Sequence, residues 1–186
     1  MKSLFSSSFF GVAPDFLKGI QLAINNTSPN GIYAGDNLFT IGRNLGFLDD
    51  KPFMDARRKY ATTDVEQSIA WRHHVLTWAA KSVLTRKVPG DFVECACYKG
   101  TSARIVCDFV DFAVSGRTYY LYDLFEHDDA DAHHAMPEHG KSLFETVKSR
   151  FADLPNVVVT KGFVPQILDE ISPGAISFLH IDLNNA

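Results

Sequence analysis

The fold of this chain is decided by residues 90–104, GDFVECACYKGTSAR. A short apolar strand with an acid near its end is followed by a tight turn that closes on Gly100. A helix then begins at once with hydroxyl residues. This order predicts the first strand and helix of a doubly wound α/β domain, which binds nucleotide-like ligands at the carboxyl end of that strand. Many βα turns share this order without binding anything, so other parts of the chain must support the prediction.

The second apolar strand, residues 118–122, supports it because it ends in Asp123. A carboxylate at this place can accept hydrogen bonds from both hydroxyls of a ribose. The alternative is an acid that caps the next turn. The glycine turn, the helix start and Asp123 together indicate a bound nucleoside.

Strands and helices alternate through the rest of this region. Apolar runs predict strands at 91–95, 118–122, 156–160 and 175–181, and helices at 102–114, 141–151 and 164–171, with a polar loop at 126–140. Such alternation is typical of a mostly parallel sheet covered on both faces. We therefore expect a Rossmann-like domain at residues 89–186, preceded by a helical appendage at residues 1–88.

Within the appendage, residues 53–60 predict a short helix. Thr63 and Glu66 have the spacing of a capping box, which opens a helix that continues to about Arg86. Turn-forming residues gather at 25–31, 35–37 and 42–44.

Composition restricts the class of protein further. The chain has 186 residues with 46% apolar residues, enough for one domain with a real core. A net charge of -4 without a basic run argues against nucleic-acid binding. No apolar stretch reaches the roughly 18 residues that cross a membrane, and we find no secretory signal. Cys95, Cys97 and Cys107 fit packed, reduced thiols, so we expect a cytoplasmic protein.

Two further strand ends carry candidate site residues. Gly162 and Phe163 follow the third strand, where glycine lets a flat ring lie against the backbone and the phenyl ring stacks on it. An ordinary turn is an equal alternative. Asp182 follows the fourth strand and is suited to a divalent cation or a substrate hydroxyl. His180 is expected on the same face as Asp182, as a base or as a packed core histidine.

The loop at residues 127–139 is rich in histidine and aspartate. A metal site is one interpretation of this composition. Because the ligand-type residues have no regular spacing, we favour a mobile lid over the site.

Six segments together resemble a known family. They are DNLFTIGRNLGFLDD (36–50), WRHHVLTWAAK (71–81), GDFVECACYKGTSARI (90–105), YLYDLFE (120–126), LPNVVVTKGFVPQIL (154–168) and ISFLHIDLNNA (176–186). The last four, in this order, resemble the macrocin/mycinamicin-type (TylF-like) S-adenosylmethionine-dependent O-methyltransferases, which are class I methyltransferases. The first two also resemble sugar-methylating relatives.

The resemblance implies methylation of a hydroxyl on a sugar or another small polar molecule. It implies that the methionine and ribose part of the cofactor pocket is lined by Glu94, Ala96, Tyr98, Gly100 and Ser102. Asp123 would bind the ribose hydroxyls, with Gly162 and Phe163 near the adenine. Asp182 would be one ligand of a magnesium ion that holds the acceptor, and His180 would assist proton removal.

The sequence departs from the family at two places. Ala96 replaces a glycine, which is tolerated if its φ is negative. Family members continue beyond residues 180–182, so we expect the C-terminal strands of the sheet to be missing and the fourth strand to form an open apolar edge. Such an edge invites pairing with another chain, as in a homo-oligomer.

Two other functions stay open from the sequence. One is a catalytically inactive or truncated cofactor-binding module, or an interaction protein, of the same fold. The other is a nicotinamide-dependent dehydrogenase, which is disfavoured because residues 96–100 lack the G-x-G-x-x-G turn.

Overall fold

The computed structural model describes residues 3–6, 8–27, 30–127 and 136–183. The chain divides into two compact units, Met1–His74 and Val75–Ala186. Helix α4, Ala70–Thr85, begins in the first unit and ends in the second.

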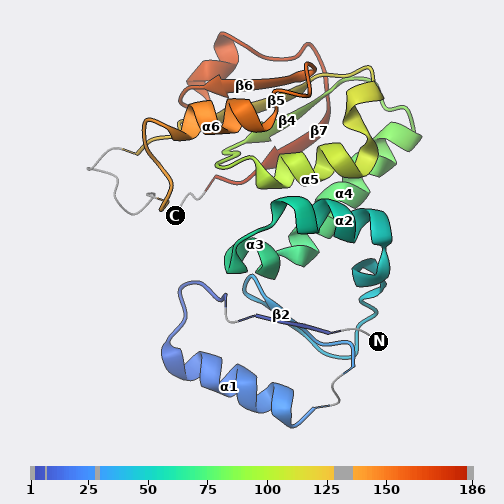
Figure 1. Cartoon of the computed structure of the whole chain (residues 1–186), viewed down its shortest axis with the longest axis vertical. Coiled ribbons are helices and arrows are strands. Elements are labelled where there is room, and N and C mark those ends of the chain that lie inside the picture. Colours follow the sequence, from blue (N-terminus) through green and yellow to red (C-terminus); the bar gives the residue numbers. More distant parts are fainter. Residues whose placement is uncertain (1–2, 7, 28–29, 128–135, 184–186) are drawn as a thin grey trace. The chain divides into compact units, whose positions relative to one another are not determined.

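The second unit is built on a four-stranded parallel sheet (Figure 1). Its strands are β4 (Asp91–Cys95), β5 (Tyr119–Asp123), β6 (Val157–Lys161) and β7 (Ile176–Ile181), in the order β6-β5-β4-β7. The chain moves outward from β4 to β6 and then returns to pair β7 with the other side of β4. This reversal is the topological switch point of a doubly wound sheet, so the predicted α/β fold is confirmed.

The connecting helices are shorter than the sequence predicted. Helix α5 covers Thr101–Val110 and stops because Asp111 takes a left-handed conformation, with φ of 52°, before the 3-10 turn Phe112–Val114. Helix α6 is Leu143–Arg150, and the helix expected at 164–171 is only a 3-10 turn, Gln166–Asp169. Apolar spacing alone did not show where these backbones leave helical geometry.

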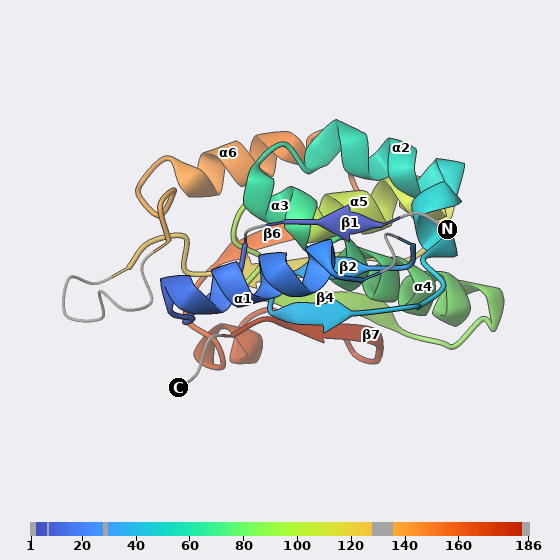
Figure 2. The same cartoon turned by 90° about the horizontal axis from the view of Figure 1, so that it is seen from below.

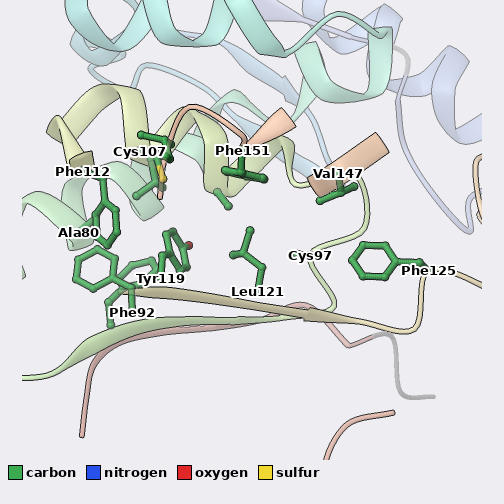
Figure 3. Packing of buried hydrophobic residues seen from close by; sticks show 14 of the residues in the cluster. Ala80, Phe92, Cys97, Cys107, Phe112, Tyr119, Leu121, Phe125, Val147 and Phe151 are labelled. Carbon is green, nitrogen blue, oxygen red and sulfur yellow. The ribbon is translucent and has the colours of Figure 1, made fainter. Parts of the chain in front are cut away.

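Alternate side chains of the strands divide the core of this unit into two layers. One layer joins the sheet to α4, α5 and α6; Figure 3 shows Phe92, Tyr119 and Leu121 directed from the strands toward Cys107, Val147 and Phe151. The opposite layer is smaller and contains Val93, Cys95, Tyr122 and Ile167. The three cysteines are buried and free, as predicted.

Strand β7 lies at the edge of this sheet. Phe178 is buried in the larger layer, whereas Leu179 and Ile181 on the other face are 52% and 58% exposed. The edge is therefore apolar, as expected, and self-association through it stays a prediction.

The first unit combines a small sheet with four helical segments. Strands β1 (Leu4–Phe5), β2 (Tyr33–Gly35) and β3 (Leu38–Thr40) form the order β1-β2-β3, with β1 beside β2 in Figure 2. The helices are α1 (Pro14–Asn25), α2 (Lys51–Tyr60) and α3 (Asp64–Ser68), with a 3-10 turn at Gly46–Asp49. The sequence predicted the helices after residue 50 but not this sheet, because strands of two or three residues show no alternation.

The predicted capping box is present, but the helix that it opens is interrupted. Thr63 and Glu66 cap α3, which ends at Ser68, and α4 begins at Ala70. The hydroxyl of Tyr33 donates to the Ser68 carbonyl and accepts from the Trp71 amide at 3.0 Å. A side chain inserted in this way replaces hydrogen bonds of the helix and divides it.

Among the described residues, we find no helix with both the length and the apolar character needed to cross a membrane.

Candidate functional site

The carboxyl ends of the parallel strands are linked by backbone hydrogen bonds, which hold the segments after them together. After β4, the amides of Ala96 and Cys97 donate to the Tyr122 carbonyl of β5, at 2.8 and 3.2 Å. The Gly162 amide, after β6, donates to the Asp123 carbonyl at 3.0 Å. The Asp182 amide, after β7, donates to the Cys95 carbonyl at 3.1 Å. Most of the predicted site residues therefore lie along one edge of the sheet.

The turn after β4 has three left-handed residues in alternation. The φ angles are 63° at Ala96, 49° at Tyr98 and 69° at Gly100. The condition under which an alanine is tolerated at position 96, a negative φ, is not met, and the left-handed conformation there costs an L-residue free energy.

Gly100 is required for packing as well as for conformation. A Cβ at this position would lie 2.7 Å from the Phe151 ring of the segment after α6. Gly100 is also the N-cap of α5, so Thr101 and the half-buried Ser102 form the first turn of that helix. The Gly100 amide itself donates to the Cys97 carbonyl at 2.7 Å, so a polar ligand at this edge would meet the first turn of α5 rather than the amides of the loop.

Asp123 joins the two turns that follow β4 and β5. Its Oδ2 accepts from the Tyr98 amide at 2.7 Å, and its Oδ1 accepts from the Phe125 amide at 2.6 Å. The side chain is buried, and burial raises the pKa of the carboxyl, although the Phe125 amide and the charge of His139 oppose the rise. A carboxylate has about four acceptor positions, so these two hydrogen bonds do not use its full capacity to accept from a ligand hydroxyl.

Tyr98 connects this turn to the segment before α6. Its hydroxyl accepts from the Glu138 amide at 3.3 Å, and the His139 ring lies edge-on to the phenol ring with centroids 5.4 Å apart. Burial lowers the pKa of His139, and the Asp123 charge opposes this. The predicted lid at 127–139, and the metal site that is its alternative, fall mostly on residues 128–135, outside the described residues.

Glu94 lies within the helix-covered layer of the sheet. Its Oε2 accepts from the Tyr119 hydroxyl at 2.9 Å and lies 3.4 Å from Nδ1 of His180. Burial, together with the Glu94 charge, raises the pKa of Tyr119 well above its ordinary value. The sequence analysis singled out Glu94 and His180 but missed Tyr119, because the face that residues of two neighbouring strands share depends on the register of the sheet.

Gly162 and Phe163, the two residues predicted to contact the adenine, have different roles in the segment after β6. A Cβ on Gly162 would lie 2.6 Å from the Ile167 side chain, so packing alone requires the glycine. Phe163 is 61% exposed, a large apolar side chain at the edge that carries Asp123. Its ring is open to a ligand, whereas Gly162 shapes the turn.

Asp182 is exposed just after β7. The described residues contain no group of three or more histidine, cysteine, aspartate or glutamate side chains that would hold a metal ion. Asp182 and its described neighbours therefore do not fit a magnesium site by themselves.

No family model matches the chain, and no curated protein matches it. The chain is similar to a structure described as the O-methyltransferase NovP, with a TM-score of 0.49 and 19% sequence identity. The match covers 60% of this chain and 52% of that one, so the chain spans about half the length of that structure.

Proposed function

We propose that the protein binds S-adenosylmethionine at the carboxyl edge of its parallel sheet. The observation that carries this proposal is Asp123, a buried carboxylate at the end of β5 that holds the turn after β4 through the Tyr98 amide. It stands where a ribose diol binds in doubly wound sheets. The first turn of α5, at the end of this loop, would face a polar tail, and the exposed ring of Phe163 would stack on a flat base.

The reaction that fits best is transfer of the methyl group to a hydroxyl of a small polar molecule such as a sugar, as in the family that the sequence resembles. The carbon–sulfur bond breaks as the carbon–oxygen bond forms, and the hydroxyl proton needs an acceptor. Nδ1 of His180 lies 3.4 Å from Oε2 of Glu94, and a proton on Nδ1 would leave the lone pair on Nε2. We assign proton removal to that atom and the positioning of the ring to Glu94 and Tyr119.

The test separates binding from chemistry. Calorimetric titration with S-adenosylhomocysteine should give micromolar binding to the full chain. Phe163→Ala should weaken this binding about tenfold or more without changing the melting temperature, because the side chain is largely exposed. Val114→Ala is the matched control, since Val114 is 77% exposed and precedes β5 at the amino edge of the sheet. A folded chain without binding would overturn the proposal.

The second arm measures methyl transfer from labelled S-adenosylmethionine to a panel of sugars and sugar derivatives. His180→Gln should keep cofactor binding and lose transfer. Binding without transfer to any hydroxyl compound would leave the other function of the same fold, a cofactor-binding module without catalysis.

A further inference from the structure

A pocket lies in the second unit, between the turn after β4 and one face of α6. It has a volume of about 370 Å³, within the size range of small-molecule sites. Its lining comes from the turn (Lys99), from the segment before α6 (Glu138) and from α6 with its N-cap (Ser142, Leu143, Thr146, Val147 and Arg150). The last five positions follow helical spacing, so they form one continuous stripe.

The lining combines apolar, positively charged and hydroxyl side chains. Leu143 and Val147 are buried and form an apolar floor. Lys99 and Arg150 supply two positive charges, and Ser142 and Thr146 supply hydroxyls. Cations and hydroxyls over an apolar floor are suited to a small molecule that carries an anionic group.

Both cations are held in place by neighbours. Lys99 is largely buried, and its Nζ lies 3.2 Å from Oε1 of Glu138, which is more exposed. Arg150 donates from Nη1 to Oγ1 of Thr101 at 3.4 Å. Its carbonyl accepts from the buried Arg104 at 3.0 Å, which fixes the end of α6. Ligand binding therefore loses little side-chain freedom, and an anion would replace the Glu138 carboxylate beside Lys99.

We infer that this pocket binds a small anionic molecule, with a phosphate or carboxylate group between Lys99 and Arg150. The inference does not rest on the proposed methyl transfer. The pocket shares its turn with the candidate cofactor site, because Lys99 lies between Tyr98 and Gly100, but it opens beside α6 rather than at Asp123.

The test is calorimetric titration of the full chain with four probes: inorganic phosphate, glucose 6-phosphate, glucuronate and glucose. The anionic probes should bind in the millimolar range or better, and glucose should not bind. Their ranking distinguishes a phosphate site from a carboxylate site. Absence of binding by all three anions to the folded chain would overturn the inference.

Variants locate the binding. Lys99→Gln and Arg150→Gln should each weaken it about tenfold or more, whereas Glu138→Gln should tighten it by removing a competing carboxylate. Lys148→Gln is the matched control, because Lys148 is also on α6 but pairs with Glu145 and does not line the pocket. An equal loss in Lys148→Gln would indicate general charge attraction and contradict a defined site.

Melting temperatures confirm that each variant is folded. If Lys99→Gln or Arg150→Gln fails to fold, the tighter binding expected for Glu138→Gln still tests the inference. A parallel titration with S-adenosylhomocysteine separates the two ideas. Binding of S-adenosylhomocysteine without binding of the anions overturns only this inference. Binding of the anions without binding of S-adenosylhomocysteine overturns only the proposed function.

Discussion

At the scale of single residues, Ala96 is the clearest conflict between side chain and backbone. Its φ of 63° costs an L-residue about 1–2 kcal/mol, and a glycine avoids that cost but loses some entropy on folding. Ala96→Gly should therefore stabilise the chain by about 0.5–1 kcal/mol, measured by urea unfolding. Ala152→Gly, at an exposed position without a positive φ, should instead destabilise it slightly. Equal losses in the two variants would contradict the strain argument.

Asp123 gives a prediction about pH. Burial raises the pKa of its carboxyl, so protonation in the folded chain begins at a higher pH than for an ordinary aspartate, whose pKa is 3.8. Protonation neutralises the Asp123 carboxylate, which accepts a hydrogen bond from the Tyr98 amide and would accept others from a ribose. Binding of S-adenosylhomocysteine should thus be constant near neutral pH and fall as the pH drops through this raised pKa.

Calorimetry between pH 4 and pH 8 checks this, with Asp123→Asn as the comparison. The variant should bind more weakly, with an affinity that does not follow this titration. An acid limb that persists in the variant would assign the titration to another group.

The residue scale also shows what sequence could and could not predict. The strand-end positions of Asp123, Phe163 and Asp182 follow from the order of elements, and the structure places them at one edge. Tyr119 as the partner of Glu94 depends on which neighbouring strand faces it, and that requires the register of the sheet. The left-handed Ala96 was missed because an alanine carries no local signal for that conformation.

At the scale of elements, the junction of α3 and α4 depends on one hydroxyl. Tyr33→Phe would leave the Ser68 carbonyl and the Trp71 amide without this partner in a buried place. The expected loss is about 1–3 kcal/mol of unfolding free energy, measured by urea unfolding. Tyr120→Phe is the control, because the half-buried Tyr120 interacts through its ring, which stacks on that of Tyr122 and is kept in the variant. This substitution should change the free energy of unfolding by less than about 0.5 kcal/mol. Similar losses in both would contradict the role of the hydroxyl.

Element prediction succeeded where patterns are long and failed where tertiary contacts act. The parallel strands, α2 and the capping box could be predicted from the sequence, since apolar runs and caps are local signals. The division between α3 and α4 was not, because its cause is Tyr33, which is distant in the chain. The small sheet of the first unit was also missed, since its strands pair through contacts that no short segment encodes.

At the scale of the whole molecule, the sheet of the second unit has hydrogen-bonded backbone amides at both ends, and only one end is proposed to bind ligand. At the carboxyl end, the amides of Tyr98, Phe125 and Gly162 all donate to Asp123. At the amino end, the amides of Asp91, Phe92 and Tyr119 donate to loop carbonyls at 2.9 Å. A ligand that stabilises the folded state slows exchange most where it suppresses local opening.

Hydrogen exchange with and without S-adenosylhomocysteine should therefore slow the three carboxyl-end amides well beyond the three amino-end amides. Both sets are hydrogen-bonded backbone amides at the ends of the same sheet, so the comparison reports the position of the ligand rather than a general gain in stability. Equal slowing at the two ends would mean that binding acts through global stability alone. Slowing confined to the amino end would place the ligand away from Asp123 and contradict the proposed cofactor site.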